Sequence, residues 1–260
     1  MERILVVFNC YFNYRDIERT IVSVLANNVP VDIIFLENPS KYSDKIKEIA
    51  DKYKIFMHLM CSGNIEFNTF TLFCNTYPEI VSQYDYIAIT EADVVLPDGS
   101  IQECFSILKK YDNCGNCSIF PETNFEKYKS LPLHDWVVPP SRILDDCVEA
   151  RAGLQFIIFK KDFLMSYIDS INKKEICGHV ILGCHNFYGF SDVNLAKFIS
   201  LKNKNWLATK YNKLDHIGWE HFLDVNDEYW IERSKNIAAG KIRVNFDLSQ
   251  YHFIDITNKL

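Results

Sequence analysis

Two carboxylates follow a buried apolar stretch in the first half of the chain. Glu91 and Asp93, with Ala92 between them, come directly after residues 86–90, whose composition is typical of a strand buried in a sheet. Carboxylates two positions apart in a loop can turn toward one site. Hard divalent cations such as Mg²⁺ and Mn²⁺ prefer carboxylate oxygens together with substrate phosphates. A solvated turn before residues 97–99 is the alternative interpretation, and this short motif alone does not decide between the two.

Glu91 and Asp93 follow the last of four predicted strands, and each of these strands is followed by a predicted helix. Apolar stretches at residues 3–8, 31–36, 55–60 and 86–90 predict buried strands. Helical spacing follows each stretch, in the sets Ile17, Ile21, Val24 and Leu25; Ile46, Ile49, Ala50 and Tyr53; Phe70, Phe73, Cys74 and Tyr77; and Ile101, Cys104, Phe105 and Leu108. This alternation predicts an α/β fold with a Rossmann-like, mostly parallel sheet flanked by helices. Ligands bind such sheets beyond the carboxyl ends of the strands, here residues 9–13, 37–40, 62–64 and 91–93.

The second half of the chain is less regular. Its patterns predict strands at 117–120, 154–159 and 206–210, helices at 161–171, 192–200 and 226–239, and surface loops at 121–150 and 172–190. Residues 251–256 alternate between apolar and polar. Because no repeat, low-complexity tract or flexible linker divides the sequence, we expect a single domain.

Composition excludes several classes of protein. The 260 residues are 48% hydrophobic and 24% charged, which excludes a disordered chain, a collagen-like fibre and a coiled coil. A net charge of -6 argues against electrostatic binding of nucleic acid, because phosphate contacts need clustered Lys and Arg. No stretch approaches the ~20 apolar residues of a membrane span, and no secretory signal is recognisable. We therefore expect a cytoplasmic protein without a transmembrane segment.

The nine cysteines are scattered through apolar stretches, which indicates reduced, buried thiols. Cys114 and Cys117 have the spacing of zinc ligands. A second group consists of Cys177, His179, Cys184 and His185. No second closely spaced cysteine pair completes a zinc site, and a redox role is disfavoured because Cys114 and Cys117 precede a strand rather than a helix. The glycine-rich strings that bind phosphates and the Gly-x-Ser-x-Gly string of hydrolases are absent from the sequence.

Several short motifs follow one another between residues 3 and 218. They are Phe12-Asn13, residues 21–25, Glu37-Asn38-Pro39-Ser40, Asn75, residues 86–96, Ala152-Gly153, residues 190–195 and His216-Ile217-Gly218. In order and spacing, these motifs resemble those of the nucleotide-sugar-dependent glycosyltransferases of the GT-A fold, most closely the large inverting group called family 2, with residues 86–96 at the Asp-x-Asp position. The chain departs from the family pattern at Glu37 and Glu91, where the family has Asp, and at Ser191, where it has Glu.

The resemblance implies a divalent metal, Mn²⁺ or Mg²⁺, that neutralises the charge developing on the diphosphate leaving group of the donor. Asp93 is the first expected ligand, and Glu91 is expected to bind directly or through water. His216 is a further candidate ligand, for which a structural hydrogen bond is the alternative. Asp192 is the expected general base that takes the proton from the acceptor hydroxyl. The alternative for Asp192 is a helix N-cap.

The donor nucleotide is expected over the carboxyl ends of the first strands. Its candidate contacts are Tyr11, Phe12, Asn13, Glu37, Asn38, Asn64, Glu91, Ala92 and Asp93. Tyr11 and Phe12 can stack on a base or flank it. Glu37 can accept hydrogen bonds from ribose hydroxyls or from a base N–H. Asn38 and Ser40 can instead form an Asx-type turn.

The acceptor is expected in the irregular half of the chain. Candidate contacts there are Asp135, Trp136 and Gly153. The face of Trp136 suits the C–H surface of a sugar, with anchoring of the loop to the core as the alternative. Arg142 and Arg151 can hold a phosphate of the donor or of a lipid-linked acceptor, or can be solvated surface charges.

Taken together, the resemblance implies an inverting glycosyltransferase. It would move a sugar from a UDP-, GDP- or dTDP-linked donor to a hydroxyl of an acceptor glycan or glycolipid, as in polysaccharide biosynthesis. The expected domain spans residues 1–218, with a nucleotide-sugar-binding half at 1–112 and an acceptor-side half at 113–218. Residues 219–260 form an extension packed on the same domain.

Two other functions stay open at this point. One is a catalytically inactive homologue that binds a sugar nucleotide or serves as a partner subunit. The other is a nucleotidyltransferase, which is disfavoured because residues 9–13 lack the Gly and Lys of the basic loop that such enzymes use. Peripheral contact with the inner face of a membrane also stays open, although no basic amphipathic helix supports it.

Overall fold

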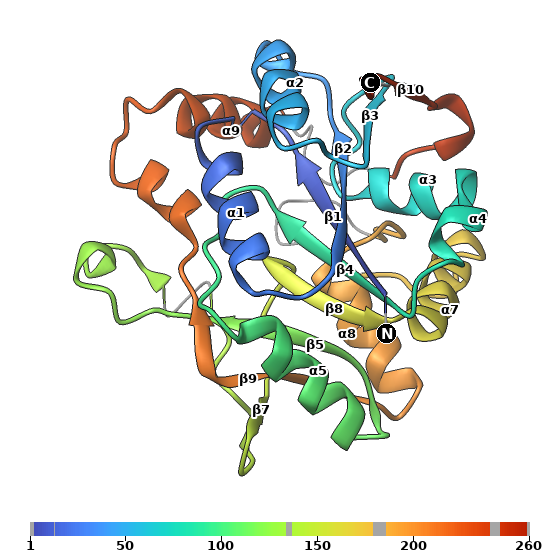
Figure 1. Cartoon of the computed structure of the whole chain (residues 1–260), viewed down its shortest axis with the longest axis vertical. Helices are drawn as coiled ribbons and strands as arrows, with labels where there is room; N and C mark the ends of the chain where they lie inside the picture. The colour runs from blue at the N-terminus through green and yellow to red at the C-terminus, as the bar shows by residue number, and fades with distance from the viewer. Residues whose placement is uncertain (1–2, 13, 134–136, 179–185, 240–244, 259–260) are drawn as a thin grey trace.

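The computed structural model describes residues 3–12, 14–133, 137–178, 186–239 and 245–258. These residues form one ten-stranded sheet with helices on both faces (Figure 1). The strand order is β10-β3-β2-β1-β4-β8-β5-β9-β7-β6. The predicted fold class, a single α/β domain with a sheet flanked by helices, is confirmed.

The first four strands form the parallel part of the sheet. They are β1 (Ile4–Cys10), β2 (Val31–Glu37), β3 (Met57–Cys61) and β4 (Tyr86–Glu91), and their order β3-β2-β1-β4 is parallel throughout. Each strand coincides with a stretch that the sequence predicts. In Figure 1, the arrows of β1 and β4 point toward the side of the molecule where η2 (Ile217–Phe222) and α9 (Glu228–Ala238) lie.

The second half of the chain makes the sheet mixed. β8 (Phe156–Lys160) pairs antiparallel with both β4 and β5 (Cys114–Pro121), so it lies between two strands that share one direction. Because the chain leaves β5 at the carboxyl edge of the parallel strands, it re-enters the sheet from that edge and β8 runs back. β9 (Asn205–Leu214) is parallel to β5, and β7 (Cys147–Glu149) and β6 (Arg142–Ile143) follow antiparallel. The parallel arrangement expected for most of the sheet thus describes its first four strands.

Residues 121–150, expected as a surface loop, contain regular structure. They include η1 (Glu126–Tyr128) and the short strands β6 and β7, and Cys147 and Val148 are buried. β7 forms its ladder with β9, a strand far away in the sequence. Strands of two or three residues depend on such a partner, and a local pattern does not reveal them.

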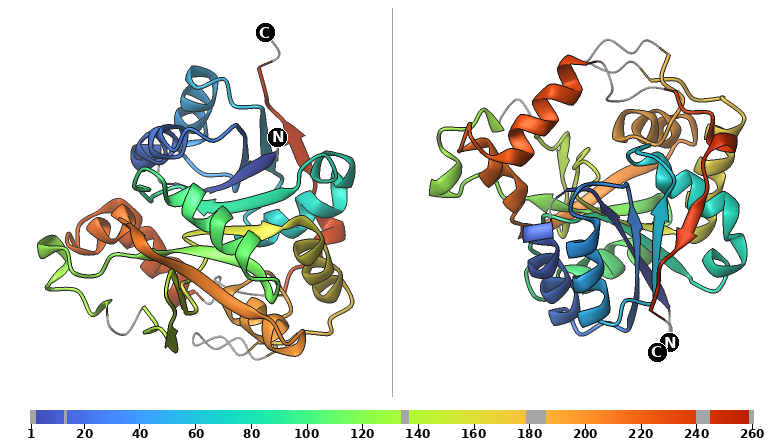
Figure 2. Two further views of the ribbon diagram at one scale, coloured as in Figure 1. Left: turned by 60° about the horizontal axis from the view of Figure 1, so that its bottom comes forward. Right: turned by 90° about the horizontal axis from the view of Figure 1, so that it is seen from above.

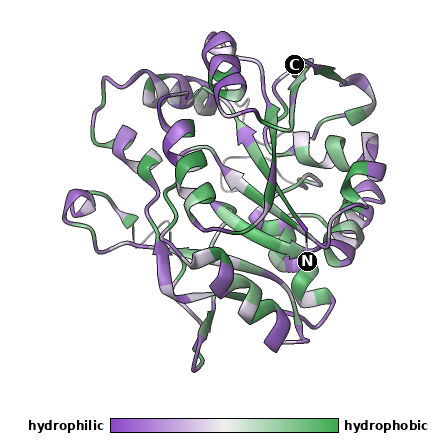
Figure 3. Ribbon diagram, in the orientation of Figure 1, coloured by the Kyte–Doolittle hydropathy of each residue, from purple (hydrophilic) through white to green (hydrophobic). Residues whose placement is uncertain are grey.

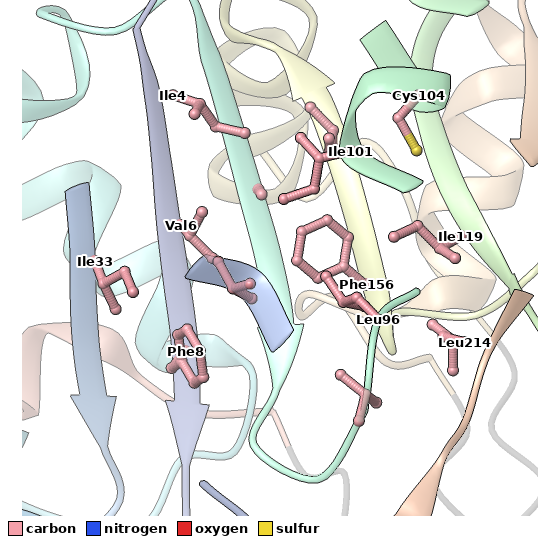
Figure 4. Packing of buried hydrophobic residues seen from close by; sticks show 14 of the residues in the cluster. Ile4, Val6, Phe8, Ile33, Leu96, Ile101, Cys104, Ile119, Phe156 and Leu214 are labelled. Atoms are coloured by element: carbon pink, nitrogen blue, oxygen red, sulfur yellow. The ribbon is translucent and has the colours of Figure 1, made fainter. Parts of the chain in front are cut away.

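Successive side chains of β1 face opposite sides of the sheet. Ile4, Val6 and Phe8 pack with α1 (Tyr14–Ala26), α2 (Ser43–Lys52) and α5 (Ser100–Lys110), in a core drawn in part in Figure 4. Leu5 and Val7 pack on the other side with α3 (Asn68–Thr76), α4 (Pro78–Val81), α7 (Lys161–Asn172) and α8 (Asp192–Leu201). Figure 3 shows the apolar strands between these helices. Burial on both faces gives the residues that follow β1 and β4 a rigid support.

The C-terminal residues complete the sheet. After η3 (Leu248–Gln250), the strand β10 (Phe253–Asp255) pairs antiparallel with β3 and places Phe253 opposite Cys61. β10 therefore forms an edge of the sheet, and Figure 2 shows α9 and β10 from two further sides. None of the helices in the described part of the chain combines the length and the apolar composition that crossing a bilayer requires.

Candidate functional site

The end of β4 places two carboxylates at the carboxyl edge of the sheet. Glu91 is the last residue of β4 and lies opposite Asn9 of β1. Ala92 is buried, and Asp93 follows it with only 3% of its surface exposed. Both carboxylates thus sit at the edge where α/β sheets bind ligands.

Backbone contacts hold the segment that contains His216 against the loop that follows β4. Val95 and Asp215 form an antiparallel bridge, with N···O distances of 2.8 and 3.0 Å. The N–H of Gly218 donates to the carbonyl of Asp93 at 3.1 Å. The segment that carries His216 is therefore fixed beside the loop after β4, as the sequence-based assignment of a shared site requires.

Glu91, Asp93 and His216 form one group that could hold a metal ion. Their ligand atoms lie within 4.8 Å of one another, and no other set of three His, Cys, Asp or Glu in the described residues does so. Nε2 of His216 and Oε2 of Glu91 are 2.7 Å apart. Oδ1 of Asp93 and Nδ1 of His216 are buried and lack a hydrogen-bond partner within the described structure. Two carboxylates, an imidazole and buried ligand atoms without partners fit a divalent cation such as Mn²⁺.

Burial and neighbouring charges control the protonation of this group. Burial raises the pKa of Asp93 to about 6; His216 partly opposes this rise, and Glu91 adds to it. Burial also lowers the pKa of His216, but Asp93 and Glu91 raise it by more, so the net shift is upward. A cation bound here would stabilise the ionised carboxylates, because it would supply the positive charge that two close carboxylates lack.

Gly218 packs directly against the carboxylate of Asp93. A Cβ atom at this position would clash with Oδ2 of Asp93. Replacing Gly218 with Ala should therefore displace the carboxylate and weaken Mn²⁺ binding by about 10-fold or more, since a ligand shift of well under 1 Å disturbs a metal site. Isothermal titration with MnCl₂ measures this change.

The control for Gly218→Ala is Gly99→Ala. Gly99 has a left-handed φ of 80°, so Ala there strains the backbone without approaching the metal group. We expect Gly99→Ala to lower Tm but to leave Mn²⁺ affinity unchanged. Equal Mn²⁺ affinity in wild type and Gly218→Ala would contradict the arrangement described here.

A second cluster of charges joins α1 to η2, and the sequence analysis did not identify it. This His221 cluster consists of Arg15, Asp16, His221 and Asp227. Nε2 of His221 lies 2.7 Å from Oδ2 of Asp16, and Nδ1 lies 3.1 Å from Oδ2 of Asp227. Arg15 donates to the same Oδ2 of Asp227 at 2.8 Å. The cluster fixes η2 and the start of α9 against the start of α1, and no local pattern marks residues that meet only through the tertiary structure.

Replacing His221 with Gln should destabilise the protein more at pH 5.5 than at pH 8.5. Burial lowers the pKa of His221, but Asp16 and Asp227 raise it by more, so the folded pKa exceeds the unfolded value of about 6.5. The stabilisation is complete below that unfolded value and is lost as the pH rises through the folded pKa. We expect a loss on the order of 1 kcal/mol at pH 5.5, or about 2–4 °C in Tm.

Thermal denaturation at both pH values measures this difference. His252→Gln is the matched control, because His252 is exposed and lies outside the His221 cluster. An equal loss of Tm at the two pH values for His221→Gln would mean that the charge on His221 does not hold η2 in place.

Aromatic side chains gather at the end of β1. Phe12 is buried, with a left-handed φ of 61°, and Tyr11 adjoins it with ring centroids 6.0 Å apart. The ring of Phe12 lies 4.9 Å from that of Tyr42 and 6.3 Å from that of Tyr229 on α9. A cavity of about 230 Å³ opens here, lined by Phe12, Tyr14, Arg15, Tyr42 and Glu228. Phe12 therefore lines the cavity, Tyr11 adjoins Phe12 without being one of the lining residues, and Asn13 lies outside the described residues.

Glu37 does not present its carboxylate to this cavity. It is completely buried, and its Oε2 lies 2.7 Å from Nε2 of the buried His58 on β3. The physical reason is strand alternation: Glu37 continues the row of Ile33 and Phe35, which face the core. The contact with ribose or base expected from the sequence is therefore corrected to a buried pair within the sheet.

Asn38 is also structural in this arrangement. Its Nδ2 donates to Asn9 and to the carbonyl of Glu66, and its Oδ1 accepts from the N–H of Ile65 at 2.8 Å. These bonds tie β1, β2 and the loop after β3 together, and because Asn38 is buried its amide is not presented to a donor molecule. Asn64, by contrast, is exposed at the surface near the end of β3.

Asp192 begins α8, but it is not the N-cap. Oγ of Ser191 caps the helix by accepting from the N–H of Asn194 at 3.2 Å. Oδ2 of Asp192 lies 2.6 Å from Nη2 of Arg151, and 28% of the Asp192 side chain stays exposed. The capping alternative is therefore excluded for Asp192, whose carboxylate is held by an arginine and open to solvent.

Residues 151–155 run alongside the end of β4. The N–H of Glu91 donates to the carbonyl of Gln155 at 3.0 Å. Gly153 has a φ of 74°, and a Cβ there would clash with the side chain of Gln155, so the turn requires glycine. Arg151 and Gly153 thus belong to a loop that continues to the metal group, whereas Arg142 pairs with Glu149 at the surface.

The remaining sequence-based candidates fall into two groups. Asp135, Trp136, His179, Cys184 and His185 lie outside the described residues. Cys114 and Cys117 are buried, and burial is the main cause that raises the pKa of the Cys114 thiol to about 11. Neither cysteine takes part in the metal-ligand group found in the described structure.

Sequence comparisons give distant relatives. No family model matches the chain. Two uncharacterized proteins of Acanthamoeba polyphaga mimivirus, L137 and L142, are each 22% identical, over 218 and 236 residues. The alignments cover 79% and 85% of this chain but 28% and 45% of L137 and L142. The chain therefore spans less than half the length of these relatives.

Solved structures reveal a shared fold. The mannosyltransferase PcManGT from Pyrobaculum calidifontis, in complex with GDP-Man and Mn²⁺, matches with a TM-score of 0.53 and 12% identity, over 94% of this chain and 65% of that one. S. aureus TarS 1–349, alone and with UDP-GlcNAc, matches with a TM-score of 0.50, over 96% of this chain and 68–69% of TarS. Identity of 11–12% shows the fold alone. The chain thus has the mixed α/β architecture of these GT-A-like glycosyltransferases.

Proposed function

We propose that this chain is a metal-dependent glycosyltransferase that uses a nucleotide-diphosphate sugar. The observation that carries the proposal is the buried group of Glu91, Asp93 and His216 at the carboxyl end of β4, beside an aromatic cavity. The shared fold supports it, because PcManGT holds GDP-Man with Mn²⁺ and TarS holds UDP-GlcNAc at similar overall architecture. A bound cation would also give a partner to Oδ1 of Asp93, which is buried and lacks one within the described residues.

Each residue of the metal group has a role in this proposal. Asp93 and Glu91 would hold Mn²⁺ or Mg²⁺ through carboxylate oxygens, and His216 would add an imidazole nitrogen. A divalent ion held there would supply Lewis-acid stabilisation of the diphosphate leaving group. Trp219 stacks on His216 with ring centroids 4.8 Å apart, and Gly218 leaves room for the carboxylate of Asp93. These contacts keep the ligands in place before the donor arrives, which lowers the reorganisation needed during reaction.

Asp192 is the proposed general base. As the acceptor oxygen attacks the anomeric carbon, the bond between that carbon and the β-phosphate oxygen breaks, and its electron pair stays with the diphosphate. Asp192 takes the proton that the acceptor hydroxyl loses. One displacement of this kind inverts the configuration at the anomeric carbon. Arg151 donates to Oδ2 of Asp192, and the N–H of Val193 donates to Oδ1 at 2.8 Å, so the carboxylate is held in one orientation while part of the side chain stays exposed.

In this proposal the two halves of the chain bind the two substrates. Residues 1–112 would bind the donor, and residues 113–218 would carry the base and bind a glycan or glycolipid acceptor. Residues 219–260 would pack on the same domain, since η2 and α9 lie at the carboxyl edge and β10 joins the sheet. A nucleotidyltransferase activity has no comparable support, because the loop after β1 carries aromatic residues instead of glycine and lysine.

A thermal-shift panel tests the proposal. GDP-mannose, UDP-GlcNAc and a dTDP-sugar are added with and without MnCl₂ to the full chain. A ligand that binds only the folded state raises Tm by mass action, by roughly 5 °C at 100 times its Kd. We expect one nucleotide sugar to raise Tm in a metal-dependent way and then to be consumed in a turnover assay with glycan acceptors.

The other outcomes of the thermal-shift panel test donor binding, the metal role and catalysis separately. A shift that is independent of metal would keep the donor site and remove the metal role of Glu91, Asp93 and His216. Binding without consumption of any donor, over a broad acceptor panel, would favour a non-catalytic sugar-nucleotide-binding protein. No shift with any nucleotide would reject the proposed donor class.

A further inference from the structure

α9 lies at the mouth of the proposed donor site, outside the stretch that resembles the glycosyltransferases. Tyr229 stands between two groups of that site: its ring centroid lies 6.3 Å from that of Phe12 and 5.1 Å from that of His221. Glu228 contacts Tyr42 and Lys41 across the cavity. The helix is therefore attached to both the aromatic end of β1 and the His221 cluster.

Arg233 is one helical turn after Tyr229, so the two side chains share a face of α9. Nη1 of Arg233 lies 3.4 Å from the hydroxyl of Tyr229, and its guanidinium carbon lies 5.6 Å from the ring centroid of Phe222. The hydroxyl of Tyr11 interacts with Asn236, the next residue on this face. Tyr229 and Asn236 thus place this face of α9 against Tyr11 and Phe12, and Arg233 lies between them on the same face.

Arg233 differs from the other arginines of the described structure in its charge environment. Six of the seven arginines are described, and five of these form an ion pair with a carboxylate within 4.0 Å, namely Arg3, Arg15, Arg19, Arg142 and Arg151. No described carboxylate lies within that distance of Arg233, which keeps an exposed surface although protein atoms surround much of its guanidinium. An arginine without an ion pair is available to bind an anion.

The carboxylates of the metal group nevertheless act on Arg233. Burial lowers the pKa of its guanidinium, but Tyr229 and the charges of Glu91 and Asp93 raise it by more. Burial and Asp93 together contribute to raising the pKa of Tyr229 to about 12. The charges of Glu91 and Asp93 thus act on the face of α9 that bears Tyr229 and Arg233, although neither carboxylate forms an ion pair with Arg233.

Charge balance indicates which ligand could contact both the metal group and Arg233. A divalent cation on Glu91, Asp93 and His216 would present positive charge, and Arg233 adds positive charge from α9. A diphosphate carries two or more negative charges and offers oxygen atoms in both directions. Guanidinium groups bind phosphate oxygens through paired N–H donors, which a lysine cannot reproduce.

We propose that Arg233 binds the diphosphate of the donor from the side opposite Asp93, so that α9 forms a wall of the donor site. This inference rests on the proposed function, since it names the group that recognises the diphosphate in that same site. It makes Arg233 a binding residue whose contact strengthens as the leaving group gains charge. Tyr229 holds the guanidinium in position through its hydroxyl.

Isothermal titration on the full chain with MnCl₂ tests this assignment. The probes are GDP, GMP and guanosine, and UDP, UMP and uridine. The variants are Arg233→Gln, Arg233→Lys and, as the matched control, Lys235→Gln. Lys235 is exposed and two residues further along α9, so it faces a different direction. Tm of each variant reports its folding.

We expect Arg233→Gln to weaken binding of the nucleoside diphosphate about 10- to 100-fold, the size of a charged hydrogen bond. Binding of the nucleoside should change less than 2-fold, and Arg233→Lys should recover only part of the loss. Lys235→Gln should bind all probes like wild type. Mn²⁺ alone should bind Arg233→Gln as tightly as wild type or more tightly, because a nearby positive charge has been removed.

Three outcomes would overturn the assignment. Unchanged diphosphate binding in Arg233→Gln, with wild type binding well, would reject Arg233 and leave the proposed function intact. Equal weakening of diphosphate and nucleoside would mean that Arg233 only holds α9 in place. If wild type binds none of the nucleotides, the proposed function fails, and this inference fails with it.

Discussion

Replacing Asp93 with Asn should abolish Mn²⁺ binding and reduce sugar transfer by at least about 100-fold. Asn preserves the shape of the side chain but removes the negative charge and one ligand oxygen, so the two remaining candidate ligands no longer balance a divalent cation. Without the ion, the leaving diphosphate loses its main electrostatic stabilisation. Isothermal titration with MnCl₂ and a turnover assay with the donor found in the thermal-shift panel measure the two effects.

Asp93→Asn should not lower the thermal stability of the metal-free protein. Asp93 is 3% exposed, and burial raises its pKa to about 6, so its ionised form is disfavoured in the folded protein. Asn removes that desolvation penalty, and we expect Tm of the metal-free variant to equal or exceed that of wild type. Asp98→Asn, at an exposed residue five positions later, is the control and should change neither Mn²⁺ binding nor Tm. Full turnover of Asp93→Asn would contradict the site assignment.

The parallel half of the fold could be predicted because its information is local. β1, β2 and β4 each contain a run of apolar residues, since their side chains pack alternately into the two cores on either face of the sheet. The strands β6 and β7 give no such pattern, because two or three residues become a strand only when β9 offers a ladder. The reversal of β8 depends on where the chain re-enters the sheet, which no residue of β8 encodes by itself.

The proximity of Glu91, Asp93 and His216 could be predicted in part. Glu91 and Asp93 follow a recognisable strand, and the resemblance supplied His216 from a distant segment, which the bridge between Val95 and Asp215 brings alongside. Glu37 shows the limit of that approach. The strand end was predicted correctly, but alternation from Phe35 turns the carboxylate of Glu37 inward to His58, and this signal was present in the sequence.

Tyr229, Arg233 and the His221 cluster could not be predicted from local patterns. Their importance depends on where α9 packs, and that is decided by contacts with Phe12, Tyr42 and Asp16 from the other end of the chain. A helical pattern for residues 226–239 reveals a helix but gives no indication of its partner. Residues that complete a site from an element outside the sheet are therefore difficult to predict from local sequence patterns.

Replacing Asp192 with Asn should reduce turnover by about 100- to 1000-fold and leave donor affinity within 3-fold of wild type. A general base contributes roughly this factor, because the acceptor hydroxyl must otherwise lose its proton to water. Asp192 lies on α8, and its partner Arg151 belongs to the loop that meets the end of β4 through Gln155. Its loss should therefore affect the acceptor step and spare binding of the nucleotide. Steady-state kinetics with donor titrated at fixed acceptor, together with donor Kd, separate the two.

Asp169→Asn is the matched control, because Asp169 is an exposed carboxylate on α7 that pairs only with Lys173 among the described residues. Arg151→Lys adds a second comparison: it keeps the positive charge but loses the planar contact, so we expect an intermediate loss of turnover with unchanged donor Kd. A fall of donor affinity in parallel with turnover in Asp192→Asn would indicate that the Arg151–Asp192 pair holds the structure together instead of acting in proton transfer. Selective loss of turnover in Asp192→Asn, with Asp169→Asn unaffected, would place the base on α8 and the acceptor between α8 and the end of β4.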